Sequence, residues 1–219
     1  MAANQGEPHV PTTGRYLDQE KVRNALDLAT TYGASYAEVR LVSFTQSSVA
    51  MRDGILERAI PGQELGLTLR ILADGAWGVH STTDIASLPE QIESTTRLAK
   101  AVASRRADGE KQIGLADIPV FEDEQHWKSK LDVRHTELDT KMDLMNDFYK
   151  GASQHKHVVS VTTGWSDEHI HTELMTSEGM DRAWSFQRSL VHGMVTARDD
   201  AEVVSYRTRT GGQGGLELI

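Results

Sequence analysis

The chain has 219 residues and a formal net charge of −9, with 32 acidic and 23 basic side chains. This balance argues against direct nucleic-acid binding, because neutralising a phosphate backbone requires clustered Lys and Arg. The sequence has no cysteine, which excludes disulfides, thiolate metal sites and a cysteine nucleophile. Neither a membrane-spanning run of roughly 20 apolar residues nor an apolar signal core occurs, so we expect a cytoplasmic protein with no membrane partner.

Three helices are predicted from apolar residues spaced three and four positions apart. Residues 1–15 are polar, contain proline and glycine, and are expected to form a flexible N-terminal lead. The first helix is expected over 18–32. The second is expected over 88–105, where Pro89 falls in the first turn and its missing N–H costs nothing. The third is expected over 134–153.

Between the first two helices, apolar and polar residues alternate, which is typical of strands with one buried face. Asp53-Gly54, Pro61-Gly62 and Asp74-Gly75 separate the alternating runs. These pairs suit tight turns, because glycine readily takes the positive φ that such turns need. The pattern predicts five antiparallel strands, at 36–44, 46–52, 55–60, 64–72 and 76–81.

Strand patterns return after the third helix, where β-branched residues are frequent. They predict strands at 158–163, 169–176, 180–192 and 203–208. Residues 110–131 show no clear period and are interpreted as a long surface connection with at most one short strand. The glycine-rich stretch 211–215 is interpreted as a flexible loop.

A helix followed by a meander of strands occurs twice, at 19–81 and at 134–209. This weak internal repeat predicts an α+β fold with a twisted, largely antiparallel sheet. The sheet is built from two helix-plus-meander halves, with helices packed on one face. The folded domain is placed at 16–209, with halves of about 16–109 and 132–209, and 210–219 is interpreted as a Gly-rich linker toward a C-terminal half not present.

Glu168, His169 and His171 form the best candidate metal site. The two histidines lie two apart on a predicted strand, which puts them on one face, and two His with a carboxylate could hold zinc. A polar, solvent-facing strand is the preferred interpretation of the same residues. No metal ligand is therefore predicted.

Other motifs are weaker still. Gly164-Trp165-Ser166-Asp167 lacks the second glycine and the following helix of a nucleophile elbow. The stretch 211–215 lacks the Lys-Ser/Thr of a phosphate-binding loop, and Trp77 is interpreted as packing on the sheet rather than as a binding platform. No catalytic or cofactor-binding residue is predicted, although exposed edge strands could accept an extended peptide by strand addition.

Three stretches between residues 36 and 84 carry a resemblance to a known family through their residues and their order. They are Tyr36-Ala37-Glu38-Val39-Arg40, then Arg52-Asp53-Gly54-Ile55-Leu56-Glu57, then Gly66-Leu67-Thr68-Leu69-Arg70 with Asp74-Gly75-Ala76-Trp77-Gly78 and Ser81-Thr82-Thr83-Asp84. Together they resemble the N-terminal domain of the TldD/PmbA family, whose members were once described as modulators of DNA gyrase. The resemblance covers residues 17–105, and the second half matches in layout only.

The resemblance implies a zinc metallopeptidase, a hydrolase for proteolysis of unfolded or extended peptides, that works as a homodimer or as a heterodimer with a related subunit. The family's zinc motif, His-Glu-x-x-x-His, lies on a helix of the C-terminal half and does not occur in these 219 residues. We therefore expect no cofactor in this chain, and zinc in the full-length protein if its catalytic half is intact.

The resulting hypothesis is a substrate-enclosing and assembly domain of a TldD/PmbA-like metallopeptidase, inactive on its own. The alternative is a stand-alone, non-catalytic module that binds peptides or serves as a partner subunit.

Overall fold

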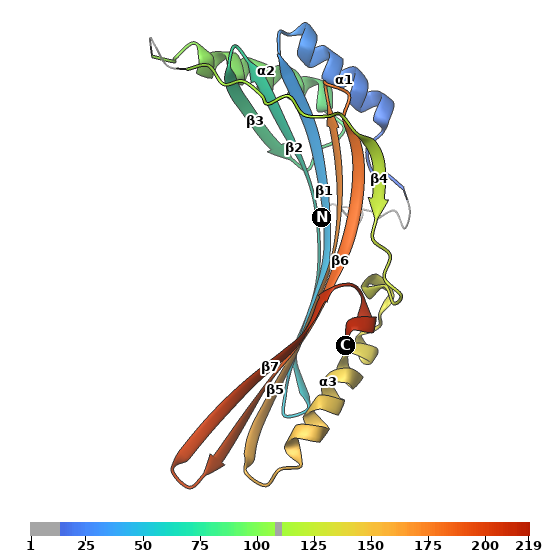
Figure 1. The fold of residues 1–219 in the computed structure, drawn as a ribbon, viewed down its shortest axis with the longest axis vertical. Helices are drawn as coiled ribbons and strands as arrows, with labels where there is room; N and C mark the ends of the chain where they lie inside the picture. Colours follow the sequence, from blue (N-terminus) through green and yellow to red (C-terminus); the bar gives the residue numbers. More distant parts are fainter. Residues whose placement is uncertain (1–13, 108–110) are drawn as a thin grey trace, which may run out of the picture. The chain divides into compact units, whose positions relative to one another are not determined.

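A computed structural model describes residues 14–107 and 111–219. In these ranges the chain forms an α+β fold, with a seven-stranded antiparallel sheet and three α-helices (Figure 1). The strand order is β3-β2-β1-β5-β6-β4, and β7 also pairs with β6. The predicted fold class is confirmed. None of the described helices is long and apolar enough to cross a membrane.

The predicted helices are confirmed to within a few residues, a short strand lies within the predicted surface connection, and two 3-10 turns are added. In chain order the elements are α1 (Gln19–Thr31), β1 (Tyr36–Arg52), β2 (Ile55–Ala73), β3 (Ala76–Thr82), α2 (Leu88–Ala103), β4 (Glu122–His126), η1 (Val133–His135), α3 (Leu138–Ser153), β5 (Val158–Thr176), β6 (Asp181–Asp199), β7 (Glu202–Gln213) and η2 (Leu216–Leu218).

The two Asp-Gly turns join neighbouring strands as predicted. Asp53 and Gly54 have φ of 50° and 78°, and Asp74 and Gly75 have φ of 51° and 71°. Positive φ at both central residues matches the twist of the flanking strands. These turns therefore fix the β1–β2 and β2–β3 hairpins.

Other predicted breaks between strands are wrong. β1 runs without interruption through residue 45, Pro61-Gly62 lies inside β2, and the stretch 164–168 lies inside β5. β3 pairs with β2 only over Leu67–Ala73, so Pro61 sits on an edge segment of β2. An edge strand tolerates proline, because an N–H that faces away from the neighbouring strand is not needed for pairing.

The chain forms two compact units, and each unit combines segments that are separated in the sequence. Within the described residues, unit 1 combines residues 14–43, 65–107, 111–125 and His171–Trp184, and unit 2 combines Phe44–Glu64, His126–Ile170 and Ser185–Ile219. The long strands β1, β2, β5 and β6 each contribute one end to each unit. Every long strand therefore has two different environments along its length.

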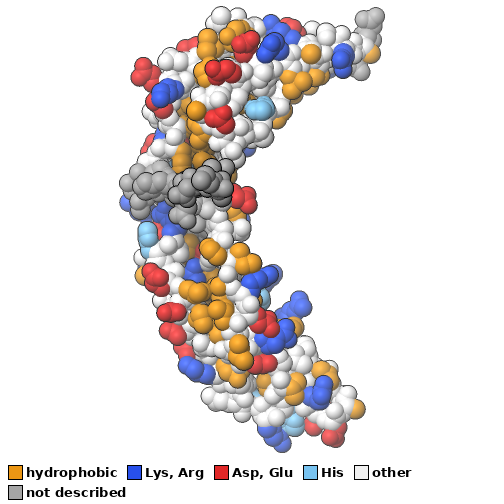
Figure 2. All heavy atoms as spheres, turned by 180° about the vertical axis from the view of Figure 1, so that it is seen from behind, with side chains coloured by type: hydrophobic (Ala, Val, Ile, Leu, Met, Phe, Trp, Pro, Cys, Tyr) orange, Lys and Arg blue, Asp and Glu red, His pale blue; other side chains and the backbone are white. Residues whose placement is uncertain are grey.

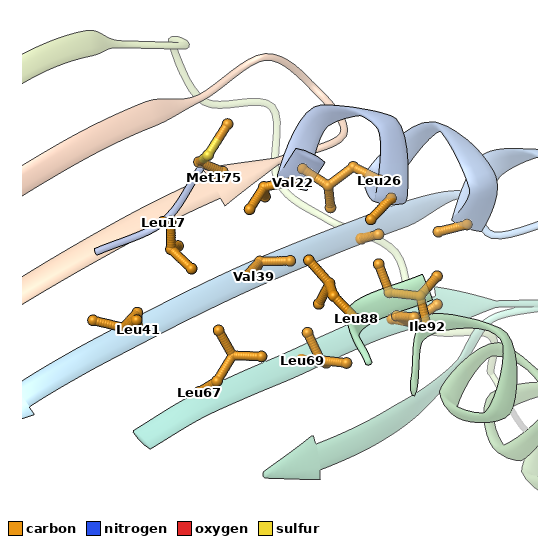
Figure 3. Close-up of a cluster of buried hydrophobic side chains, with 14 of the residues drawn as sticks. Leu17, Val22, Leu26, Val39, Leu41, Leu67, Leu69, Leu88, Ile92 and Met175 are labelled. Atoms are coloured by element: carbon orange, nitrogen blue, oxygen red, sulfur yellow. The ribbon is translucent and has the colours of Figure 1, made fainter. Parts of the chain in front are cut away.

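Unit 1 has a large apolar core between its sheet and two helices. α1 and α2 cover one face of the strands, and Val22, Leu26 and Ile92 point from them toward the sheet (Figure 3). Val39 and Leu69 meet them from β1 and β2, and both are fully buried. Burial of each such side chain stabilises the fold by about 1.5–3 kcal/mol, so this unit is held together mainly by apolar contacts.

Unit 2 has one α-helix, α3, on one face of its strands (Figure 1). Its buried apolar residues are few. Val49, Met51, Met145 and Trp165 form one cluster, and Val133 and Val161 are buried as well. The small size of this cluster leaves room for polar groups in the interior.

A buried polar network lies beside the apolar cluster of unit 2. Lys141 Nζ lies 2.6 Å from Asp167 Oδ2 and 2.7 Å from Ser47 Oγ, and both charged side chains are only 6% exposed. Ser47 Oγ also donates to Asp167 Oδ2 at 2.7 Å. The indole N–H of Trp165 donates to the same carboxylate. A buried ion pair is tolerated when further hydrogen bonds satisfy its oxygens and protons, as they do here.

Candidate functional site

The sheet of unit 2 has one face without a covering helix among the residues described. Trp165 of β5 and Val191 of β6 pack against α3 with Met145. Because side chains alternate along a strand, the even-numbered residues of β5 and β6 point the other way. We call this second side the open face, and it carries Thr162, Gly164 and Glu168 of β5, Arg188, Leu190, His192 and Met194 of β6, and Arg207 and Arg209 of β7.

A groove of about 590 Å³ lies on the open face along β5, β6 and β7. His192 is directly opposite Arg209, and Met194 is directly opposite Arg207. Side chains that face each other in this way share one side of the sheet. We call this hollow the β6–β7 groove, and it is lined by Thr162, Leu190, His192, Gly193, Met194, Arg207, Thr208 and Arg209.

Gly164 leaves room for the His192 side chain, which lines this groove, to approach β5 closely. A Cβ at position 164 would come within 2.2 Å of the His192 ring. Glycine within a strand often marks such a close approach. Gly164, the first residue of the rejected nucleophile-elbow motif, therefore shapes the groove by making room for His192.

The groove is cationic. Arg207 and Arg209 are exposed, and within 14–107 and 111–219 neither makes an ion pair with a carboxylate. The next arginine along β6, Arg188, pairs with Glu168 at 3.0 Å. In a chain with net charge −9, two neighbouring arginines without a carboxylate partner mark a local reversal of charge.

β7 is an open edge of the sheet. Its only strand partner in the described chain is β6, and all of its residues are exposed. Tyr206 is 72% exposed and Val204 is 65% exposed. An open edge leaves a row of backbone N–H and C=O groups without strand partners, so it can pair with another extended segment.

The predicted histidine pair is buried rather than solvent-facing, so that interpretation of the strand is wrong. His169 is 9% exposed and His171 is 6% exposed. His171 Nε2 lies 3.0 Å from the fully buried Glu173, which also accepts the Tyr16 N–H at 2.6 Å. These contacts fasten the start of the described chain to β5.

The same strand separates the three candidate metal ligands. Glu168 alternates with the histidines, lies on the open face and is bound to Arg188. No group of three or more His, Asp or Glu side chains able to hold a metal ion occurs within residues 14–107 and 111–219. The side chains that the structure describes therefore do not fit a zinc site.

Trp77 packs on the sheet of unit 1, as expected. The Arg70 guanidinium lies 4.5 Å from its ring centroid, and the Tyr36 ring meets it edge-on at 5.9 Å. Arg70 also contacts the buried Glu38. Burial raises the pKa of Tyr36, and its hydrogen bond to Glu38 raises it further.

The glycine-rich stretch is ordered, so the expected flexible loop is wrong for its first part. Gly211, Gly212 and Gln213 pair with Leu190, Ser189 and Arg188 of β6. The β6–β7 groove was not predicted from the sequence. The alternation of Arg207 and Arg209 was visible there, but their pairing with β6 is a long-range property.

Comparison with known families matches most of the chain. Residues 37–103 match the profile of PmbA/TldA metallopeptidase domain 1. Residues 131–219 match the PmbA/TldA metallopeptidase central domain. The second match covers the second half of the chain, where the sequence had resembled the family in layout only.

Two curated relatives are archaeal proteins named metalloproteases. One, from Methanocaldococcus jannaschii, is 25% identical over 199 residues, which are 90% of this chain and 42% of the relative. The other, from Methanothermobacter thermautotrophicus, is 26% identical over 184 residues, which are 84% of this chain and 39% of the relative. The chain thus spans about two fifths of the length of these relatives.

Solved structures share the fold. A proposed modulator of DNA gyrase from Thermotoga maritima superposes with a TM-score of 0.71 at 18% identity, covering 91% of this chain and 44% of that one. A protein of the same description from Bacteroides thetaiotaomicron gives 0.68 at 20%, covering 94% and 47%. TldE from Thermococcus kodakarensis gives 0.61 at 15%, covering 87% and 42%. With two consecutive domain profiles of one family matched along it, the chain belongs to the PmbA/TldD metallopeptidase family.

Proposed function

We propose that this chain is the non-catalytic, substrate-binding and assembly part of a PmbA/TldD metallopeptidase. In this proposal an unfolded or extended peptide pairs with the free edge of β7, beside the β6–β7 groove. The observation that carries it is the open edge of β7, which pairs only with β6 among the described residues. The family match supplies the link to peptides as substrates.

Strand addition explains why an extended peptide is the expected ligand. The affinity comes from main-chain hydrogen bonds, which any sequence can make once it is extended. A folded protein already uses these groups within its own sheets and helices. Selection for unfolded peptides therefore follows from the edge itself.

Backbone N-methylation of the peptide tests this proposal. A peptide strand that pairs on one side presents only every second N–H to β7. Methylation of that alternate set should weaken binding to the 219-residue chain at least tenfold, whereas methylation of the other set should leave it unchanged. Fluorescence anisotropy with labelled ten-residue peptides measures both, and equal affinity for the two methylated peptides would contradict strand addition.

We further propose that the edge segment 55–64 of β2 contributes to pairing with a second copy or a related subunit. Ile55 is 70% exposed and Ile60 is 50% exposed there. Figure 2 shows hydrophobic side chains among charged ones on one face of the molecule. Ile55→Glu/Ile60→Glu should shift the molar mass measured by light scattering to that of a monomer. The matched control Val79→Glu/Val102→Glu, at exposed positions of unit 1, should not.

We also propose that zinc-dependent hydrolysis requires residues outside these 219. The chain alone should retain no stoichiometric zinc by elemental analysis and should leave bound peptides uncut. The alternative function, a stand-alone peptide-binding module, shares the β7 site and differs in needing no partner. Stoichiometric zinc in the purified chain would contradict the assignment as the non-catalytic part of a metallopeptidase. The cytoplasmic location stays a prediction.

A further inference from the structure

We propose that the β6–β7 groove selects extended peptides that carry acidic side chains at alternate positions, i and i+2. The inference rests on the proposed function, because it assumes that the peptide pairs with β7. It names a sequence preference that strand addition by itself would not have. Two observations on β6 and β7 support it, and a third, on the charge of the whole chain, shows that the preference needs a local site.

The first observation is the spacing of the two arginines. Arg207 and Arg209 are two apart on β7, so their side chains leave the same face of the sheet. Residues i and i+2 of a strand are about 6.6–6.8 Å apart along its axis. A peptide strand added beside β7 has the same repeat, so two of its side chains on the open face can stand opposite the two arginines.

The second observation is that the β6 residues opposite these two arginines carry no negative charge that could neutralise them. Met194 faces Arg207 and His192 faces Arg209 across the β6–β7 ladder. Neither arginine is ion-paired with a carboxylate in the described chain, whereas Glu168 is already bound to Arg188. The side of β7 that an incoming peptide would occupy is thus the side from which carboxylates can reach both guanidinium groups.

The third observation is the charge of the chain as a whole. A net charge of −9 repels acidic peptides at long range. A preference for acidic peptides therefore requires a local site, and a nonspecific interaction with the chain would give the opposite preference.

A pair of isomeric peptides tests the inference. Both contain the same ten residues, but one has two glutamates at i and i+2 and the other has them at i and i+1. In an added strand the first places both carboxylates on one face, and the second places them on opposite faces. Opposite charges across strands strengthen pairing about threefold for each pair, so the first peptide should bind about tenfold more tightly than its uncharged glutamine counterpart and about threefold more tightly than its isomer.

The protein variant Arg207→Gln/Arg209→Gln should remove both preferences, so that it binds the two glutamate peptides and the glutamine peptide with equal affinity. Arg97→Gln/Arg105→Gln is the matched control, because it removes the same charge from exposed positions in α2 and just after it in unit 1. It should keep the preferences. Circular dichroism and thermal melts check that both variants fold. A preference that survives Arg207→Gln/Arg209→Gln would overturn the inference.

The remaining outcomes separate this inference from the proposed function. Equal binding of the glutamate isomers and the glutamine peptide would overturn the acidic preference and leave strand addition standing. Absence of binding by all three peptides would overturn the proposed peptide-binding function, and the inference with it.

Discussion

The two units use different means to hold the same kind of sheet. Unit 1 buries a broad apolar layer under α1 and α2, with Val39, Leu69 and Ile92 fully inside. Unit 2 has a single α-helix, a small apolar cluster around Trp165 and a buried Lys141–Asp167 pair. Unit 2 also carries the β6–β7 groove and the free edge of β7, which offer surface to a ligand.

The substitution Trp165→Ala is the strongest test of this difference between the two units. Trp165 is 1% exposed and is the largest side chain in the core of unit 2, so its removal should cost about 3–5 kcal/mol of unfolding free energy. Urea unfolding measures the loss, and hydrogen exchange locates it. Amides of α3 should lose protection while those of α1 keep theirs, and equal loss in both helices would mean that the units unfold as one.

The buried ion pair can be tested by removing one charge and then both. Lys141→Met leaves Asp167 charged and buried without its cation, and should cost about 3 kcal/mol. Lys141→Met/Asp167→Asn should recover most of that loss, because the amide oxygen still accepts from Ser47 and Trp165. If the double variant is as unstable as Lys141→Met, the network does not act through charge.

Packing of α2 on β3 in unit 1 gives a smaller expected effect. A Cβ at position 78 would lie 2.3 Å from the Thr95 carbonyl oxygen of α2. Gly78→Ala should therefore separate the helix from the strand and cost about 1–3 kcal/mol. Gly66→Ala is the matched control, because nothing lies within 4 Å of its Cβ position, and thermal melts of the two variants should differ clearly.

The smallest expected effect is a pH dependence at the start of η1 in unit 2. Burial alone would raise the pKa of Asp132, but hydrogen bonds from the Arg134 side chain and backbone outweigh it and lower the pKa below its ordinary 3.8. The stabilisation of the fold by the charged Asp132 is therefore fully present above its ordinary pKa and is lost as the pH falls through its lowered pKa.

Asp132→Asn should accordingly destabilise the chain by about 0.5 kcal/mol at pH 7, because the pair is partly exposed. At pH 2 the variant and the natural chain should unfold at the same denaturant concentration. A difference that is as large at pH 2 as at pH 7 would assign the effect to geometry instead of charge.

Much of the local structure was readable from the sequence. The spacing of apolar residues predicted all three α-helices, and Asp53-Gly54 and Asp74-Gly75 predicted two hairpin turns. Short-range rules were sufficient there, because each signal and its consequence lie within a few residues. The same rules failed at Pro61-Gly62, because an edge segment tolerates proline, and at Gly164, because β5 is paired on both sides and continues through a glycine.

The sequence by itself determined the fold class, the helices, the tight turns and the resemblance to the family, because these depend on residues close together in the chain. Only the tertiary structure decided that His169 and His171 are buried, and that Glu168 points away from them to Arg188. It also decided that His192 lies on Gly164 and opposite Arg209. The partners in such contacts come from different strands, and the register between strands is fixed only when the whole sheet forms.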